Sequence, residues 1–249
     1  MPAFVIFDTE STCVVLDELR IVVARLRADA CRLVFVSIHT AKNVEQSRVF
    51  SDVLCCLIQL RACVLAGGQS RRMGRDKALI PRADGRVWLT ALIDCLLSMD
   101  LAVVVVSGHP GHQPYVCQQS RVSLLLEPAP WSGPLQALSH VLSIDPGDPL
   151  LVLPVDMPCL TSVVLHQLID AWRSDPSSAA IADDGDVCQP LLGIYPSGPP
   201  FQRTLIDQLK RGDHRWLSWL GRIPHRKVLL PAHALLNANC PADLATFSA

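Results

Sequence analysis

A glycine pair, Gly67-Gly68, closely follows the apolar run Ala62-Cys63-Val64. An apolar run that stops at two glycines predicts a buried strand that enters a loop. Glycine has no Cβ, so the backbone there can take positive φ and present amide N–H groups to an anion. Four cationic side chains follow within seven residues: Arg71, Arg72, Arg75 and Lys77. A loop of this kind is suited to binding a polyphosphate.

A second candidate is Asp156, which comes directly after the apolar run at residues 150–155. A carboxylate at the end of a buried strand needs a partner, because an unpaired buried charge is costly. The hard cation Mg²⁺ is the natural partner for its oxygens. Lys77 and Asp156 are therefore the candidate catalytic residues, with Lys77 neutralising phosphate charge and Asp156 holding the metal.

The spacing excludes two common glycine loops. A Walker A loop needs glycine, four residues and then Gly-Lys-Ser/Thr, but Gly74 is followed by Arg75 and the lysine arrives only at Lys77. The Gly-x-Gly-x-x-Gly fingerprint of dinucleotide-binding domains is absent as well. The phosphate-binding loop must belong to another class.

Residues 65–77 match the pattern Leu-Ala-Gly-Gly-x-Ser-x-Arg-Met-Gly-x-Asp-Lys at every position. In this loop the sequence resembles the molybdenum cofactor guanylyltransferases, nucleotidyltransferases that attack an α-phosphate and release pyrophosphate. Residues 237–244 are similar to that family's Asn-x-Asn-Thr-Pro-Glu-Asp-Leu ending, with Cys240 at the threonine position. An ordinary helix start with Pro241 in its first turn would explain the same residues. The resemblance spans residues 61–247.

The resemblance implies Mg²⁺-dependent transfer of GMP from GTP to molybdopterin-bound molybdenum. It implies contacts of Leu65, Ala66 and Gly67 with guanine and ribose, of Lys77 with the phosphates, and of Asp156 with nucleotide and metal. Ser107 stands where many family members have asparagine, and Glu127 aligns with a base-contacting aspartate across a one-residue gap. The nucleotide-binding set implied in this way is Leu65, Ala66, Gly67, Gly68, Lys77, Ser107, Glu127 and Asp156. Molybdoenzymes and other proteins of molybdenum cofactor biosynthesis are implied as further partners.

Three alternatives stay open at this point. The first is cytidylyl transfer from CTP to the same acceptor, and the second is a sugar-phosphate nucleotidyltransferase. The third is a nucleotide-binding module without turnover. Gln136-Ala137 replaces the Ala-Gly that family members often carry after Gly-Pro-Leu, which bears on contacts with the pterin.

From Arg61 onward, strand and helix patterns alternate, which predicts βαβ units and a mostly parallel sheet. We expect a Rossmann-like α/β fold with flanking helices, and the resemblance implies the nucleotide-diphospho-sugar transferase type. Ser107, Glu127 and Asp156 each end a strand, where open α/β sheets bind their ligands. The expected helices are 88–99, 134–144, 161–173 and 200–211, and the expected strands are 102–107, 122–126, 150–155, 179–182 and 188–194.

The chain is expected to contain a nucleotidyltransferase domain at 61–249 and an N-terminal extension of unknown role at 1–60. The extension pattern predicts strands at Phe4–Phe7 and Leu33–Val36 around a helix at Leu16–Leu26. In the family that the chain resembles, the glycine loop normally lies close to the amino terminus. Residues 1–60 are thus either an added segment or the result of a start site assigned too far upstream.

Composition limits the remaining possibilities. Half of the 249 residues are hydrophobic, 18% are charged and the net charge is −1, which fits a large buried core and excludes a protein that coats nucleic acid. The ten cysteines include no Cys-x-x-Cys pair, so reduced thiols are favoured over a disulfide framework. His109 and His112 are expected in a flexible loop without a third metal ligand. Because no apolar run reaches ~18 residues, we expect neither a membrane span nor a secretory signal, and a cytoplasmic protein.

Overall fold

The computed structural model describes residues 6–7, 13–14, 21–28, 31–38, 59–68, 73–116, 119–129, 131–144, 148–198 and 200–243. The chain divides into two units, one of Met1–Gln59 with Asp145–Gly147 and the other of Leu60–Ile144 with Asp148–Ala249. Among the described residues, no helix has both the length and the apolar character that a membrane crossing requires.

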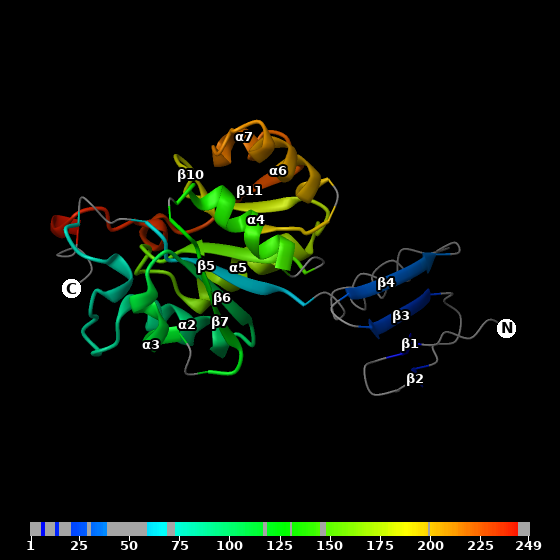
Figure 1. Cartoon of the computed structure of the whole chain (residues 1–249), viewed down its shortest axis with the longest axis horizontal. Coiled ribbons are helices and arrows are strands. Elements are labelled where there is room, and N and C mark those ends of the chain that lie inside the picture. The colour runs from blue at the N-terminus through cyan, green and yellow to red at the C-terminus, as the bar shows by residue number, and fades with distance from the viewer. Residues whose placement is uncertain are drawn as a thin grey trace. The chain divides into compact units, whose positions relative to one another are not determined.

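The described part of the first unit is a four-stranded sheet in the order β2-β1-β3-β4 (Figure 1). β3 and β4 form an antiparallel pair whose register runs from Ile21 opposite Ile38 to Ala28 opposite Cys31. β1 lies parallel to β3 and antiparallel to β2. The strand bounds are Ile6–Phe7 for β1, Cys13–Val14 for β2, Ile21–Ala28 for β3 and Cys31–Ile38 for β4.

The helix predicted at Leu16–Leu26 is wrong over residues 21–26, which belong to β3. The apolar positions fit a helical period, but Ile21, Val22 and Val23 are β-branched and lose side-chain freedom in a helix. In the sheet, Val23 lies opposite Val36, and both residues are of the β-branched type that is enriched in strands. The βαβ pattern expected for this segment is therefore replaced by an antiparallel hairpin with two short strands beside it.

The second unit is built on a seven-stranded sheet in the order β11-β9-β10-β8-β5-β6-β7. β8, β5, β6 and β7 are mutually parallel, and β9 and β11 pair in parallel at the other side. β10 runs antiparallel to both of its neighbours, so the sheet is mostly parallel, as predicted. The strands are β5 (Arg61–Leu65), β6 (Ala102–Ser107), β7 (Val122–Leu126), β8 (Leu150–Pro154), β9 (Ala179–Asp183), β10 (Cys188–Tyr195) and β11 (His225–Leu229).

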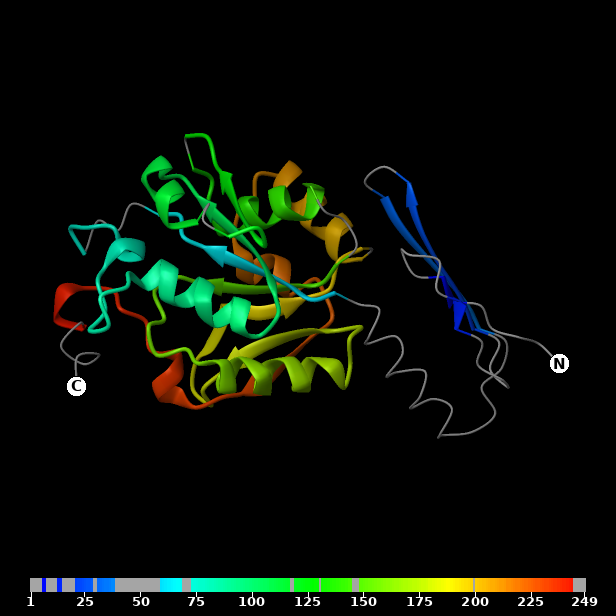
Figure 2. The ribbon, with the colours of Figure 1, turned by 90° about the horizontal axis from the view of Figure 1, so that it is seen from below.

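Helices cover both faces of this sheet (Figure 2). α4, α6 and α7 share one face, where their apolar side chains form a single core cluster with β5, β6, β8 and β9. α2 and α5 lie on the opposite face. The α-helices are α2 (Trp88–Ser98), α3 (Gln113–Val116), α4 (Pro134–Ile144), α5 (Ser162–Arg173), α6 (Phe201–Lys210) and α7 (Trp216–Leu220). The short 3₁₀ helices are η1 (Lys77–Leu79), η2 (Pro110–His112) and η3 (Ala232–Leu235).

The strongly apolar strands occupy the middle of the sheet because they are covered on both faces. All five residues of β8 are buried, and so are all but one of β5. A strand that is buried on both sides reads as a continuous apolar run rather than as an alternation. This arrangement places the carboxyl ends of β5 and β8 side by side, with Leu65 opposite Pro154, at the edge where the candidate residues follow.

Candidate active site

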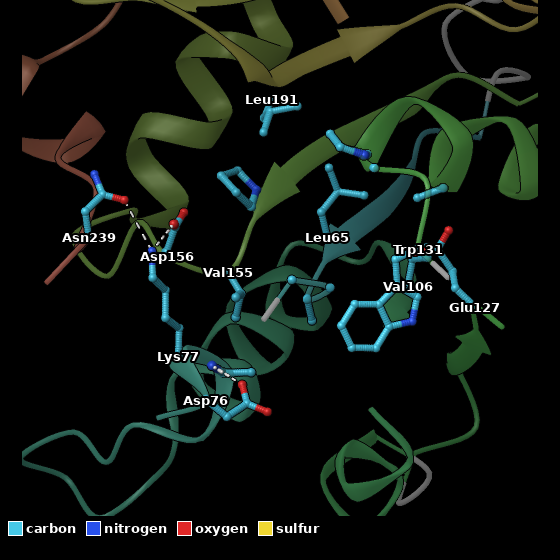
Figure 3. Close-up of a pocket in the computed structure, with 18 residues that line it drawn as sticks. Leu65, Asp76, Lys77, Val106, Glu127, Trp131, Val155, Asp156, Leu191 and Asn239 are labelled. Carbon is cyan, nitrogen blue, oxygen red and sulfur yellow. Dashed lines mark hydrogen bonds and ion pairs between the residues drawn. The ribbon is translucent and has the colours of Figure 1, made fainter. Parts of the chain in front are cut away.

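A cavity of about 720 Å³ opens at the carboxyl ends of the parallel strands (Figure 3). Its wall includes residues 65–68 at the end of β5, Val106 on β6, Glu127 after β7 and residues 154–156 at the end of β8. Loops and helix ends distant in sequence complete it, among them Trp131 and Asn239. Seven of the eight residues implied at the sequence level as nucleotide contacts lie on this wall, and Ser107 is the exception.

The glycine loop leaves β5 through two backbone hydrogen bonds that continue the sheet. Ala66 N donates to Val106 O at 2.9 Å, and Val155 N donates to Leu65 O at 3.2 Å. Gly68 then takes φ +116°, a backbone conformation that residues other than glycine rarely adopt. Gly67 has no positive φ, and a Cβ built there would lie 3.7 Å from Glu127 Oε2.

The cationic part of the loop is only partly described. Arg71 and Arg72 lie outside the described residues, together with Gln69 and Ser70. Arg75 is described, but it does not line the cavity. Of the loop's cationic side chains that the structure describes, Lys77 lines the cavity.

Lys77 stands at one end of the cavity between two oxygen atoms (Figure 3). Its Nζ lies 2.9 Å from Asp156 Oδ2 and 3.3 Å from Asn239 Oδ1. These partners are 79 and 162 residues away in the sequence, and Ala238 N ties the C-terminal segment to Asp156 O at 2.9 Å. Both charged side chains are shielded, with 15% of Lys77 and 22% of Asp156 exposed. The fold thus concentrates one positive and one negative charge at this end.

The Asn-x-Asn segment combines a contact with Lys77 and a helical turn. Asn239 reaches Lys77, while residues 241–243 form a helical turn that begins at Pro241. Asp243 Oδ2 accepts the amide N–H groups of Asn239 and Cys240 at 2.6 and 2.8 Å. These bonds fix the backbone beside Asn239, and they hold the pKa of the Asp243 carboxyl below its ordinary value.

The oxygen atoms around Lys77 are of the kind that a hard cation prefers. Asp156 Oδ2 and Asn239 Oδ1 already converge on one cationic group, the Lys77 ammonium. Among the described residues, no group of three or more His, Cys, Asp or Glu side chains could enclose a metal ion. Mg²⁺ is usually held by one or two carboxylates, with substrate phosphates and water as the other ligands. The residues present fit that mode of binding.

The opposite end of the cavity carries Glu127 and Trp131 (Figure 3). The Glu127 side chain is only 9% exposed, and Oε1 lies 3.7 Å from His140 Nδ1. Burial raises the pKa of the Glu127 carboxyl, and the attraction of His140 opposes this rise. The Trp131 ring packs against the backbone of Gly108. A Cβ at Gly108 would lie 2.0 Å from the indole, so this packing requires glycine.

Ser107 lies behind the wall and is connected through His112 to Asp76, which lines the cavity. Its Oγ is 2.8 Å from His112 Nδ1, and His112 Nε2 is 2.7 Å from Asp76 Oδ2. Ser107 and His112 are fully buried. The expectation that His109 and His112 lie in a flexible loop is therefore wrong for His112, whose ring is held at both nitrogens between two elements.

Five described cysteines are free thiols, as the absence of Cys-x-x-Cys pairs indicated: Cys63, Cys95, Cys159, Cys188 and Cys240. Only Cys63 is fully buried, on β5, and burial raises its pKa to about 12. A thiol with so high a pKa is unreactive at neutral pH.

The sequence interpretation missed Trp131, Leu191 and Asp76 as parts of the site. Trp131 precedes Gly133-Pro134 at the start of α4, and an aromatic residue in that position gives no chemical signal by itself. Leu191 belongs to the antiparallel strand β10 and reaches the cavity only through the pairing of β10 with β8. Asp76 was visible in the loop pattern, but its partner His112 is 36 residues away.

In a comparison with known protein families, residues 62–225 match the family model of the MobA-like NTP transferase domain. A probable molybdenum cofactor guanylyltransferase of Rhodopirellula baltica is 34% identical over 195 residues, covering 74% of this chain and 90% of that protein. A probable molybdenum cofactor guanylyltransferase of Synechococcus elongatus is 32% identical over 191 residues, covering 73% and 94% of the two chains.

Among solved structures, the chain is similar to molybdopterin-guanine dinucleotide biosynthesis protein A from Archaeoglobus fulgidus, with a TM-score of 0.61. The identity is 20%, and the match covers 76% of this chain and 96% of that one. At this identity the likeness concerns the fold alone. The fold is the Rossmann-like α/β architecture of the nucleotide-diphospho-sugar transferase type, as predicted.

Proposed function

This chain belongs to the MobA-like NTP transferase domain family and is a nucleotidyltransferase, and from this premise we propose that it transfers GMP from GTP to molybdopterin-bound molybdenum. The products are molybdopterin guanine dinucleotide cofactor and pyrophosphate. The names of the relatives at 34% and 32% identity support the donor and the acceptor. The observation that carries the proposal is the position of Lys77 between Asp156 and Asn239, at the end of the glycine loop.

In the proposed reaction, a phosphate oxygen of the acceptor forms a new bond to the α-phosphorus of GTP. The bond from that phosphorus to the β-phosphate oxygen breaks, and pyrophosphate leaves with the electron pair. The attacking phosphate needs little activation by a base, so the protein's task is to align the groups and neutralise charge. Lys77 is a compact positive charge on a flexible stem, and it can follow the charge that develops at the α-phosphate.

Asp156, with Asn239 beside it, would hold Mg²⁺ at the phosphate end of the cavity. When bound, the ion would supply further positive charge to the phosphate oxygens. Lys77 contacts Oδ2 of the Asp156 carboxylate, and a carboxylate can accept cations at both of its oxygens. Asp156 is therefore suited to serve the lysine and a metal ion together, while Asn239 offers a neutral oxygen on the same side.

The base preference is proposed to depend on Glu127, at the end of the cavity opposite Lys77 (Figure 3). The Watson–Crick edge of guanine has two neighbouring N–H donors, and the two oxygens of a carboxylate can accept both. Cytosine and adenine each offer a single amino donor next to a ring acceptor. A shielded carboxylate would therefore favour GTP over CTP and ATP, because unpaired polar groups in a pocket reduce binding.

The test is direct. Isothermal titration with GTP, CTP and ATP in the presence of Mg²⁺, followed by a pyrophosphate-release assay with molybdopterin-bound molybdenum, is expected to show binding and turnover with GTP. Equal or faster pyrophosphate release with CTP would assign cytidylyl transfer instead. Turnover only with a sugar phosphate as acceptor would replace the acceptor. Binding without turnover with any acceptor would leave a nucleotide-binding module.

The base preference has its own control. Glu127→Gln replaces one carboxylate oxygen by an amide nitrogen, which would face a guanine donor, so it should weaken GTP binding more than CTP binding. His166→Gln is the matched control, because His166 is exposed and its Nδ1 bonds within α5, to Ser162 O. An unchanged GTP-to-CTP ratio in Glu127→Gln would remove Glu127 from base selection.

A further inference from the structure

Three polar side chains form a hydrogen-bonded network that runs from buried Ser107 and His112 to Asp76 on the cavity wall. Ser107 ends β6, His112 ends η2, and Asp76 caps η1. The imidazole ring lies between the other two, 2.8 Å from Ser107 Oγ and 2.7 Å from Asp76 Oδ2. No part of Ser107 or His112 is exposed to solvent.

The hydrogen atoms in this network can be assigned from the fixed backbone donors. His109 N donates to Ser107 Oγ at 2.9 Å, and Ala78 N donates to Asp76 Oδ1 at 3.0 Å. A neutral imidazole with its proton on Nε2 can then donate to Asp76 Oδ2 and accept the Ser107 hydroxyl proton at Nδ1. This assignment gives each of these polar atoms a complementary partner, as buried groups require. Burial would raise the pKa of Asp76, but the bonds from His112 and Ala78 hold it below its ordinary value.

The three residue types also occur in serine hydrolases, yet this serine is no nucleophile. A nucleophilic hydroxyl must face its substrate, whereas Ser107 is fully buried and does not line the cavity. Its oxygen is also engaged by the backbone of His109. This hydrogen-bonded network therefore serves to fix the positions of the groups that it joins.

The position that it fixes is that of Lys77. Asp76 directly precedes Lys77, and its Oδ1 accepts the amide of Ala78 in the first turn of η1. The same carboxylate is held from its other oxygen by His112. Its two oxygens therefore join the start of η1 to His112 at the end of η2, and the other ring nitrogen of His112 contacts Ser107 at the end of β6. Lys77 projects from this anchored turn to Asp156.

We propose that His112 is a positioning residue that holds Asp76 and thereby places the Lys77 ammonium at the phosphate end of the cavity. The proposal rests on the proposed function for its kinetic consequence, because the lysine acts on the transferred phosphate there. A displacement of about 1 Å in a group of this kind can reduce the rate of a reaction on the order of 10²-fold.

Two amide substitutions test the contacts of His112 Nδ1 and Nε2 separately. His112→Asn can place a polar atom near the position of Nδ1, so it can keep the contact with Ser107 but loses the one with Asp76. His112→Gln is longer and can donate to Asp76 from the position of Nε2. We expect His112→Gln to retain most of the turnover and His112→Asn to lose about tenfold or more in kcat, with a smaller change in KM for GTP. Equal losses in the two variants would contradict the proposal.

A double-mutant cycle with Lys77→Ala tests whether the effect passes through the lysine. In the Lys77→Ala background, His112→Asn should cost little further in kcat, because the group that it places is already absent. Losses that multiply would overturn the proposal and assign His112 to general stability. His166→Asn, an exposed histidine on α5, is the matched control and should leave the wild-type rate unchanged.

A readout without turnover keeps this proposal separate from the proposed function. Acylation of lysine amines, followed by mass spectrometry, should label Lys77 slowly in the wild type, because it is paired with Asp156 and mostly shielded. Labelling should rise several-fold in His112→Asn and stay low in His112→Gln, with exposed Lys210 as the internal reference. If the wild type has no activity with GTP but this pattern holds, only the proposed function fails. Unchanged labelling in folded His112→Asn would overturn the positioning role. If that variant does not fold, the same measurement on Asp76→Asn decides.

Discussion

Lys77 and Asp156 are joined by one ion pair, but their chemistry predicts different defects. In the proposed mechanism, Lys77→Ala removes charge that would stabilise the transition state, and the loss of one such group typically costs ~10²–10³ in rate. Asp156→Asn removes the anionic ligand, so it should lose turnover chiefly by weakening Mg²⁺ binding. Pyrophosphate release measured against Mg²⁺ concentration distinguishes them. Added Mg²⁺ should partly rescue Asp156→Asn and leave Lys77→Ala slow.

The control for both variants is circular dichroism, which must show that each is folded. Near-normal turnover in either variant would remove that residue from the mechanism. Asn239 tests the geometry around the lysine, because its neutral Oδ1 would still face the Lys77 ammonium in Asp156→Asn. Asn239→Ala should therefore give a smaller loss than Asp156→Asn.

Asp76 predicts a pH dependence of stability. Its folded-state pKa is lowered despite the opposing effect of burial, because its carboxylate accepts hydrogen bonds from His112 and Ala78. The stabilisation is therefore fully present above the ordinary aspartate pKa of about 4 and is lost as the pH falls through the lowered folded value. At pH 7, Asp76→Asn should reduce the free energy of unfolding by about 2 kcal/mol, typical of a hydrogen bond to a charged group.

Urea unfolding of wild type and Asp76→Asn between pH 7 and pH 3 measures this effect. The difference between the two proteins should be largest near pH 7 and shrink below pH 4, since Asp76 then binds a proton first in the unfolded wild-type chain and, at lower pH, in the folded protein. A difference that stays constant over the whole range would mean that the negative charge of Asp76 contributes nothing to stability.

At the scale of single residues, the sequence was sufficient where chemistry and strand ends coincide. Asp156 and Glu127 were found because each ends an apolar run, and parallel strands bring such ends to one edge. His112 was not found, because its surroundings in sequence, Pro110 and Gly111, indicate only a loop. Its role depends on Asp76, 36 residues earlier, and no spacing within one element encodes that contact.

At the scale of elements, the βα units of the second unit could be predicted, but one edge strand, β11, could not. α2, α4, α5 and α6 lie within about one residue of the predicted bounds at each end. β11 was missed because His225–Leu229 carries charged side chains and alternates between exposed and half-buried positions. Such a strand is defined by its parallel pairing with β9, a contact that is absent from local sequence.

The loop between β6 and η2 offers a test of how closely the elements around the cavity pack. A Cβ at Gly108 would overlap the Trp131 indole at 2.0–2.3 Å, so Gly108→Ala must displace that ring from the cavity wall. Overpacking of this kind typically costs about 1–3 kcal/mol. We expect a lower melting temperature, a changed Trp131 environment in fluorescence, and weaker GTP binding.

Gly111→Ala is the matched control for this substitution. It lies in η2, three residues further along the same segment. A Cβ there would have no atom within 4 Å, and the backbone of Gly111 has no positive φ. Its stability and nucleotide binding should stay near those of the wild type. Equal effects of the two substitutions would show that the Trp131 contact does not constrain the cavity.

At the scale of the whole molecule, the family match and the division of the chain into two units place the start of the nucleotidyltransferase domain at nearly the same residue. The match begins at residue 62, and the second unit begins at Leu60, directly before β5. Every described cavity residue belongs to the second unit. The added segment and the misassigned start, the two explanations for residues 1–60, both predict that the chemistry needs only the second unit.

A truncated chain that begins at Leu60 should therefore fold and release pyrophosphate from GTP at a rate close to that of the full chain. Circular dichroism and the turnover assay, run on both proteins under the same conditions, measure this. A second truncation that begins at Met73 is the matched control, because it also removes β5, which pairs with β6 on one side and β8 on the other. Losing a buried central strand leaves the backbone groups of both neighbours unpaired and opens the core, so this chain should not fold. If the chain from Leu60 is insoluble or inactive while the full chain works, residues 1–59 contribute to the catalytic unit, and the proposed boundary is wrong.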